Sequence, residues 1–153
     1  MRVLLVDDHN LMLEGLTNLL TAYGVEVVGA ARDGLEALEL ARSLRPDVIL
    51  MDIRMPRCDG LAVTRLIKAE MPELRIVMLT TSAEDDDLFE AVKSGACGYL
   101  LKSATSRQFT EALLGLEQGI PPFSPGLAAR ILREFARKAG EPSAPAAPTK
   151  AEP

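Results

Sequence analysis

The chain alternates five times between a short apolar run and a longer segment with helical periodicity, and this alternation constrains the fold most strongly. Each run is as short as a buried strand. The runs are Arg2–Val6, Val25–Ala30, Val48–Met51, Arg75–Leu79 and Gly98–Leu101. Strands that alternate with helices pair in parallel through right-handed helical crossovers. The sequence therefore predicts a doubly wound parallel α/β sheet.

The segments between the runs carry helix-start signals and apolar residues at helical spacing. Asp33 with Glu36 is a variant of the capping box. Thr105 with Gln108 is a second capping box. The residues predicted to face the core are Met12, Leu16, Leu19, Leu20, Tyr23, Ala37, Leu38, Ala41, Leu44, Val63, Leu66, Ile67, Leu88, Ala91, Val92, Phe109, Ala112, Leu113 and Leu116.

The sequence changes character after residue 118. Prolines 121 and 122 mark a break, and Ser124-Pro125 predicts the start of a sixth, amphipathic helix that runs to about Lys138. Residues 140–153 are rich in proline and alanine and predict a disordered linker. We therefore expect a domain over 1–118, a linker helix within 119–139 and a linker over 140–153. The sixth helix is either a dimerisation or docking element or a packed linker.

Composition excludes several kinds of site. The net charge of −5 argues against a large nucleic-acid surface, because such surfaces need clustered Lys and Arg. Two cysteines and one histidine are too few for a zinc site or a multi-histidine metal site. No apolar run is long enough to span a membrane, and two acids interrupt the N-terminal run too early for a secretory signal. We expect a cytoplasmic protein without a membrane partner.

Polar residues follow four of the five predicted strands. Asp7 and Asp8 follow the first strand, Asp52 the third, Thr80 the fourth and Lys102 the fifth. In a parallel sheet these positions meet at one edge, where ligands bind. Three carboxylates there repel one another and require a cation, and oxygen ligands suit Mg²⁺. The lysine and threonine suit a phosphoryl group, and one carboxylate can act as a nucleophile to form an acyl phosphate.

At these spacings residues 1–118 resemble the receiver domain of bacterial two-component response regulators. The matching motif consists of Asp7-Asp8, Asp52, Met55-Pro56, Asp59-Gly60, Thr80 and Lys102. Residues 7–9, 79–82 and 95–102 are similar to the NarL/LuxR-type regulators, which carry a C-terminal helix-turn-helix DNA-binding domain. We expect that output domain to be absent from this chain. The resemblance implies a flavodoxin-like fold, with strand order 2-1-3-4-5 and five helices, followed here by the linker helix.

The resemblance implies a role for each acid. Asp52 would accept phosphate from a sensor histidine kinase. Asp8, Asp52 and the backbone carbonyl of Arg54 would bind Mg²⁺, and Asp7 would act on it through water. The chain would be a phospho-acceptor that assists its own phosphorylation and dephosphorylation, and not a turnover enzyme.

The resemblance also implies a switch. Lys102 would pair with the phosphoryl oxygens, Thr80 would hydrogen-bond them, and Tyr99 would change rotamer as Thr80 moves. The face made by the fourth helix, fifth strand and fifth helix would then change and control an output, transcription through the missing domain. A homodimer is a possible partner, and contact with DNA is expected only through that domain.

Three other functions compete with this interpretation. A phosphorylation-independent receiver would dimerise or dock without phosphate. A haloacid-dehalogenase-like phosphatase also uses an Asp nucleophile with Mg²⁺, but it places Asp-x-Asp after the first strand, whereas Asp7 and Asp8 are adjacent. A flavin- or mononucleotide-binding module would need a Gly-rich loop after the first strand. His9 beside the acid pair is interpreted as a loop or helix-start residue in preference to a metal ligand.

Overall fold

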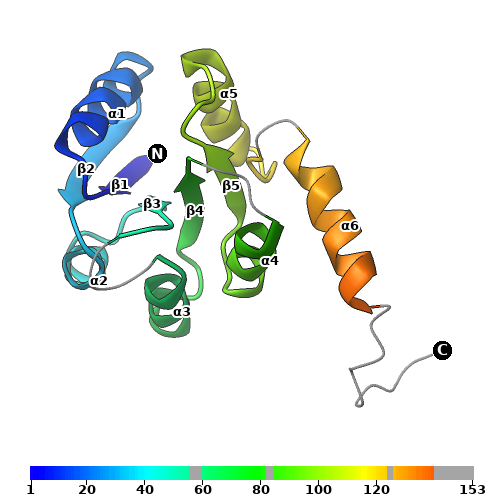
Figure 1. Ribbon diagram of the computed structural model, residues 1–153. Helices are drawn as coiled ribbons and strands as arrows, with labels where there is room; N and C mark the ends of the chain where they lie inside the picture. Colours follow the sequence, from blue (N-terminus) through cyan, green and yellow to red (C-terminus); the bar gives the residue numbers. More distant parts are fainter. Residues whose placement is uncertain (56–59, 82–84, 124–125, 140–153) are drawn as a thin grey trace.

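The computed structural model describes residues 1–55, 60–81, 85–123 and 126–139, which form five strands and six helices (Figure 1). The elements in chain order are β1 (Arg2–Val6), α1 (Asn10–Ala22), β2 (Glu26–Ala31), α2 (Gly34–Leu44), β3 (Val48–Asp52), α3 (Gly60–Glu70), β4 (Arg75–Thr80), α4 (Asp85–Lys93), β5 (Gly98–Leu101), α5 (Ser106–Leu116) and α6 (Leu127–Ala139). None of the helices in the described ranges is long and apolar enough to cross a membrane.

The strands form one parallel sheet in the order β2-β1-β3-β4-β5, which confirms the expected doubly wound fold. Met51 of β3 pairs with Val6 of β1 on one side and with Met78 of β4 on the other. Met78 in turn pairs with Tyr99 of β5. The residues that follow these four positions therefore emerge at the same edge of the sheet.

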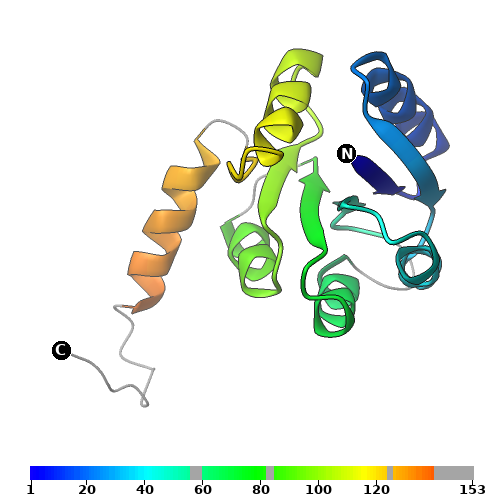
Figure 2. The same cartoon turned by 180° about the vertical axis from the view of Figure 1, so that it is seen from behind.

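Two apolar cores lie on the two faces of the sheet. Helices α1 and α5 cover one face, and α2, α3 and α4 cover the other (Figures 1 and 2). Side chains of each central strand alternate between the cores, as the pleat requires. In β3, for example, Ile49 and Met51 join the core under α2, α3 and α4, whereas Val48 and Leu50 join the core under α1 and α5. The continuous apolar runs are thus explained by burial on both faces.

Most predicted core positions are buried or partly buried, but Leu66 and Tyr23 are not. Leu66 is 55% exposed, because the inward face of α3 is formed by Val63 and Ile67, and Leu66 lies one position out of phase with them. Tyr23 is 50% exposed because it is the C-cap residue of α1, where the chain turns away from the helix.

The two predicted capping boxes differ. At α5 the box is complete: the Thr105 hydroxyl accepts from the Gln108 N–H at 3.1 Å, and the Gln108 side chain accepts from the Thr105 N–H at 3.0 Å. At α2 the Asp33 carboxylate accepts from the Glu36 N–H at 2.9 Å, whereas the Glu36 carboxylate accepts from the Arg32 N–H, one residue before the cap. The α2 box is therefore shifted by one residue on its return contact.

Helix α6 lies within the predicted linker-helix region and packs against α4 at one side of the molecule (Figures 1 and 2). Its residues Leu127 and Ile131 pack into the core under α4. The predicted Ser124-Pro125 helix start and the linker over 140–153 lie outside the described residues, as do Pro56, Cys58 and Asp59.

Candidate functional site

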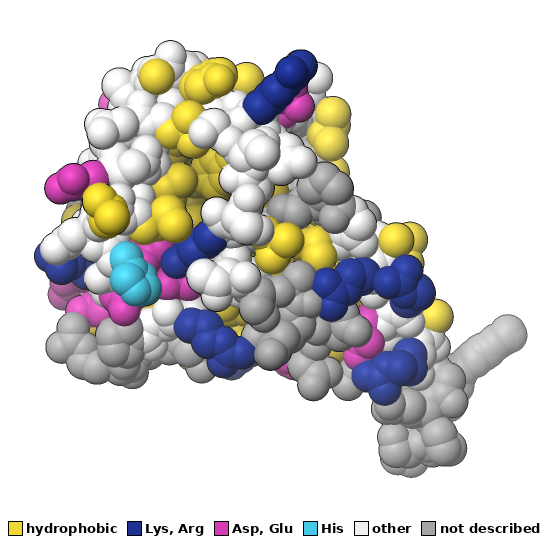
Figure 3. Space-filling view, turned by 45° about the horizontal axis from the view of Figure 1, so that its top comes forward, with side chains coloured by type: hydrophobic (Ala, Val, Ile, Leu, Met, Phe, Trp, Pro, Cys, Tyr) yellow, Lys and Arg dark blue, Asp and Glu magenta, His cyan; other side chains and the backbone are white. Residues whose placement is uncertain are grey.

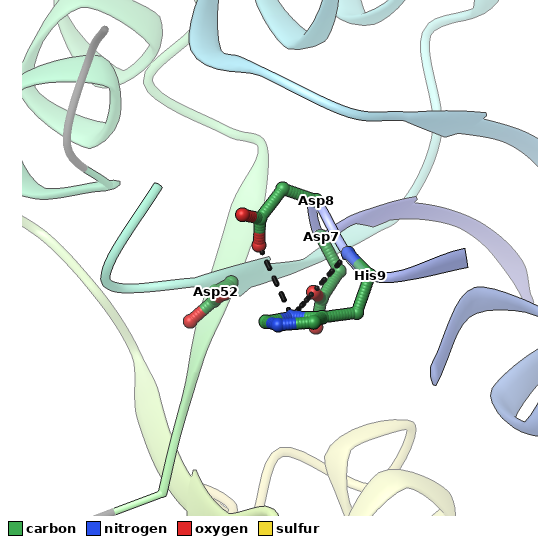
Figure 4. Close-up of side chains that lie close together, drawn as sticks. All are labelled: Asp7, Asp8, His9 and Asp52. Carbon is green, nitrogen blue, oxygen red and sulfur yellow. Dashed lines mark hydrogen bonds and ion pairs between the residues drawn. The ribbon is translucent and has the colours of Figure 1, made fainter. Parts of the chain in front are cut away.

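Three carboxylates gather at the edge of the sheet where β1 and β3 end, as the sequence predicts (Figure 4). Asp7 and Asp8 follow β1, and Asp52 is the last residue of β3. Asp7 and Asp52 are only 1% and 4% exposed, whereas the Asp8 side chain is 30% exposed. One ligand atom from each of them, and one from His9, lie within 4.8 Å of one another. We call Asp7, Asp8 and Asp52 the acid cluster.

The Lys102 side chain is the cation that faces the buried acids. Its ammonium Nζ lies 2.7 Å from Asp7 Oδ2 and 3.3 Å from Asp52 Oδ2, and the side chain is only 9% exposed. Lys102 follows β5, and its backbone N–H donates to the Thr80 carbonyl at 2.7 Å. That bond holds the lysine and the end of β4 together, so the predicted lysine and threonine arrive at the same place.

The two buried acids are held differently. Asp7 Oδ1 accepts from the His9 backbone N–H at 2.9 Å, and Asp7 Oδ2 makes the shorter contact with Lys102. Asp52 Oδ1 accepts from the Arg54 N–H at a longer 3.2 Å, and its other oxygen makes the longer contact with Lys102. Asp52 is thus the more loosely held carboxylate of the buried pair.

The pKa values of Asp52 and Lys102 are both raised, for different reasons. Burial raises the pKa of the Asp52 carboxyl above its usual value, and the Arg54 hydrogen bond and the Lys102 charge offset only part of that rise. The pKa of Lys102 is also raised. Burial, the largest single influence, acts to lower it, but the combined hydrogen bonds and charges of Asp7 and Asp52 outweigh burial. Lys102 therefore stays cationic beside a relatively basic Asp52 carboxylate.

His9 lies closer to the acids than a plain helix-start residue would need to. It is the N-cap residue of α1, as the sequence predicts, and its side chain is 70% exposed. Its ring atom Nδ1, however, lies 3.1 Å from Asp7 Oδ1 and 3.2 Å from Asp8 Oδ1 (Figure 4). Its place next to the acid pair in the sequence is the signal for this contact. The His9 ring therefore lies within contact distance of both carboxylates of the acid pair.

The donor set of the acid cluster fits a hard divalent cation. Three carboxylates face a single ammonium group, so the described site carries excess negative charge. Carboxylate oxygens at this separation are the ligands that Mg²⁺ prefers, whereas an imidazole suits softer metals. The Arg54 backbone reaches the cluster through its N–H, and the role of its carbonyl stays a prediction.

Thr80 and Tyr99 occupy the two strands beside the acid cluster. Thr80 is the last residue of β4 and is 4% exposed, and Tyr99 lies within β5 and is fully buried. Tyr99 belongs to the core under α2, α3 and α4. The alternation of β4 places Thr80 on the same face of the sheet, since Ile76 and Met78 point into that core.

The end of β3 is held by a close approach that the sequence does not reveal. A Cβ atom on Gly60, at the start of α3, would lie 2.5 Å from the Asp52 carbonyl oxygen. The Gly60 N–H donates to the Ile53 carbonyl at 3.0 Å, and the Ile53 N–H donates to the Leu79 carbonyl at 3.0 Å. In the sequence Gly60 indicates only a loop, but it is also needed for α3 to begin against the residue that carries the site.

An apolar pocket of about 590 Å³ lies beside the acid cluster, between α1 and α5 (Figure 3). His9, Thr81 and Lys102 contribute to its lining. The apolar lining comes from Leu11, Met12, Leu16, Leu19, Leu79 and Phe109. The pocket borders the acid cluster through His9 and Lys102, which contact the acids.

Comparison with known proteins agrees with this geometry. The family model of the response regulator receiver domain matches residues 3–114. The chain is 37% identical over 138 residues to the transcriptional regulatory protein LnrK of Bacillus subtilis (strain 168), covering 90% of this chain. The chain spans 63% of the length of LnrK.

Two solved structures share the fold. The signal receiver domain of the response regulator NarL from Mycobacterium tuberculosis matches with a TM-score of 0.74 and 38% identity, over 78% of this chain and 97% of that one. A LuxR-family two-component response regulator from Aurantimonas sp. SI85-9A1 matches with a TM-score of 0.82 and 32% identity, over 88% and 97% of the two chains. The chain belongs to the receiver domains of two-component response regulators, and within them to the NarL/LuxR type.

Proposed function

We propose that Asp52 accepts a phosphoryl group from a phosphohistidine of a sensor histidine kinase, in a reaction that depends on Mg²⁺. The observation that carries the proposal is the difference between the two buried acids. Asp7 is held by the His9 N–H and by the short Lys102 contact, whereas Asp52 makes longer contacts and has a raised pKa. A loosely held carboxylate whose pKa is raised by burial is suited to act as a nucleophile.

Transfer requires one Asp52 oxygen to attack phosphorus while the bond from phosphorus to the kinase histidine nitrogen breaks. Asp8, Asp52 and the Arg54 carbonyl would hold Mg²⁺, with Asp7 acting through water. The bound ion would neutralise charge on the phosphoryl oxygens. Lys102 lies 3.3 Å from Asp52 and would pair with the transferred group. The chain thus assists its own phosphorylation and dephosphorylation without turning over a separate substrate.

Phosphorylation would then change the packing of the strands beside the site. It adds about −1.5 to −2 charges and three acceptor oxygens to Asp52. These oxygens would draw in Lys102 and the Thr80 hydroxyl, and the Lys102 N–H bond to the Thr80 carbonyl joins the two movements. Tyr99 lies one strand away on the same face and would change rotamer, which alters the face made by α4, β5 and α5.

We further propose that the output is transcriptional. LnrK is named as a transcriptional regulatory protein, and this chain matches 63% of its length. DNA contact would come from a separate output domain and not from residues 1–153, consistent with their net charge of −5. Residues 1–118 would form the receiver, 119–139 the linker helix and 140–153 the linker, with a homodimer as one mode of action.

Intact-mass measurement tests the acceptor. The wild type, Asp52→Ala and the control Asp47→Ala are incubated with Mg²⁺ and acetyl phosphate. Asp47 precedes β3 at the opposite edge of the sheet, where its carboxylate accepts from the Arg2 N–H. We expect one added phosphoryl group on the wild type and on Asp47→Ala, lost in Asp52→Ala or with chelator present. No adduct on the wild type, even after rapid quenching, would instead favour a phosphorylation-independent dimerisation or docking module.

A further inference from the structure

Residues 121–123 lie along the outer edge of β5, the last strand of the sheet. Phe123 forms a parallel bridge with Tyr99, and the Tyr99 N–H donates to the Pro122 carbonyl at 2.9 Å. The sequence predicts only a break here, but the break is paired to the sheet. The residue expected to act as the aromatic switch is therefore bonded through its backbone to the segment that precedes α6.

Gly98 permits this pairing. A Cβ atom at Gly98 would lie 2.4 Å from the Pro122 carbonyl oxygen and 2.5 Å from the Pro122 ring atom Cγ. Real Cβ atoms do not approach other atoms so closely, so any larger residue at position 98 would push the segment away from β5. The contact between β5 and this segment is so close that it requires glycine at position 98, where even the methyl group of an alanine would not fit.

Helix α6 attaches the same segment to α4. The rings of Phe135 in α6 and Phe89 in α4 are 4.6 Å apart between centroids and tilted by 57°, a favourable aromatic geometry. Phe89 is 6% exposed and Leu127, at the start of α6, is 2% exposed. We call residues 121–123 together with α6 the clamp, because they contact β5 at one end and α4 at the other.

The charges of the two helices are complementary. The α4 segment contains four acidic residues and one basic residue, whereas α6 contains four basic residues and one acidic residue. Arg side chains of α6 lie along one side of the molecule (Figure 3). The acidic residue of α6, Glu134, is 5% exposed and paired with Arg137. Long-range attraction therefore favours α6 at α4 in addition to the aromatic contact.

The clamp is nevertheless held by a limited apolar contact. Phe135 remains 41% exposed and Leu132, on the same helix, is 71% exposed. A helix that buries only part of its apolar face opens at a lower free-energy cost than the fully buried strands. Helix α6 can therefore be released from α4 while the sheet stays folded.

Tyr99 cannot change its rotamer independently of these neighbours. It is fully buried, in the core that also contains Leu127 and against which Phe123 packs. Close-packed side chains have no free volume into which an aromatic ring can turn, so movement of Tyr99 displaces what surrounds it. The clamp, bound to both β5 and α4, holds these two elements in one relative position.

We propose that the clamp opposes phosphorylation of Asp52: the clamp stabilises the present arrangement of α4 and β5, and phosphorylation releases α6 from α4. The inference rests on the proposed function. Because the clamp and the phosphoryl group favour different arrangements of α4 and β5, a weakened clamp raises the population of the arrangement that phosphorylation favours. We therefore expect such a variant to be phosphorylated more readily. The first element to respond to phosphorylation is thus a helix of the same chain.

The test uses the full 153-residue chain in four forms: wild type, Phe135→Ala, Gly98→Ala and the control Leu132→Ala. Each is brought to steady state with Mg²⁺ and a fixed concentration of acetyl phosphate, and intact mass gives the ratio of phosphorylated to unphosphorylated protein. We expect Phe135→Ala and Gly98→Ala to raise this ratio by about five- to tenfold, at the low end of the usual range of coupling between sites. Leu132→Ala should leave it unchanged.

Hydrogen exchange supplies the second reading. In the wild type, phosphorylation should accelerate amide exchange across residues 126–139, and Phe135→Ala should do so without phosphate. Equal phosphorylation ratios in all four proteins, or an α6 whose exchange is unaffected by phosphorylation, overturn the clamp alone. Absence of an adduct from every protein overturns the proposed function and the coupling with it, so the two failures are distinguished.

Discussion

Strand β3 and helix α6 bury their apolar residues to very different extents. Every residue of β3 is buried, and its side chains fill both cores. In α6, Leu127 is buried, but Leu132 and Phe135 are 71% and 41% exposed. A strand enclosed on both faces has one way to pack, whereas a helix attached along part of one face can be displaced. The sheet therefore fixes the position of the acid cluster, and the clamp remains free to respond to it.

The largest change in stability is expected from a large-to-small substitution in the fully buried region. Leu50 has no exposed surface and lies in the core under α1 and α5. Leu50→Ala should lower the free energy of unfolding by about 3 kcal/mol, through lost burial and the cavity left behind. The same change at Leu132 should alter it by less than about 0.5 kcal/mol. Urea denaturation of both variants measures the difference, and equal losses would refute the contrast between strand and helix.

A smaller loss of stability is expected from a methyl group added at the end of β3. Gly60→Ala places Cβ against the Asp52 carbonyl oxygen, a backbone atom that cannot rotate aside. We expect a loss of about 2 kcal/mol, as in other overpacked sites. Gly15 is the matched control, because a Cβ there meets nothing within 4 Å. A Gly60→Ala variant as stable as Gly15→Ala in urea would show that α3 can shift at little cost.

The smallest effect has the opposite sign and concerns charge within the enclosed region. Asp52→Asn should raise the free energy of unfolding by about 1 kcal/mol at pH 7 without Mg²⁺, because it removes a carboxylate from a site that disfavours charge. The raised pKa of Asp52 means that the folded protein holds this proton more tightly than the unfolded chain. The wild type is therefore penalised above that pKa, and the penalty disappears as the pH falls through it.

Urea denaturation of Asp52→Asn and wild type with chelator, at pH 7 and at mildly acidic pH, measures this effect. The stability advantage of the variant should shrink at the lower pH. Asp47→Asn, at the exposed end before β3, serves as the control and should show no comparable gain. An advantage that grows on acidification would contradict the raised pKa.

Much of the fold was predictable because it depends on local patterns. The bounds of β1 and β5 and the complete Thr105–Gln108 box were predicted as they occur, since short apolar runs and capping pairs are read within a few residues. The prediction failed at Leu66, where apolar character alone did not determine which side of the helix faces the core. Apolar periodicity predicts that a helix has a buried face, but the packing of neighbouring elements decides how many residues that face includes.

The convergence of Asp7, Asp52 and Lys102 also followed from the sequence, because parallel strands deliver their ends to one edge. The close approaches did not. Pro122 against Gly98, and α3 against the end of β3, join positions that no sequence spacing relates to each other. Each of these contacts depends on the absence of a Cβ atom at a glycine. In a sequence, however, a glycine indicates a turn as readily as it indicates a close contact with another segment.

The alternation of side chains in β4 limits how this chain can vary over generations. Thr80 shares the face of Ile76 and Met78, toward α4 and the clamp, while Val77 and Leu79 point toward α1 and α5. Inserting or deleting one residue within β4 would turn the Thr80 hydroxyl to the opposite face. During evolution the loops between the elements can therefore change in length. We expect β4 to accept substitutions but no insertion or deletion, because the number of residues in the strand decides which face of the sheet, and so which helices, the Thr80 side chain is turned toward.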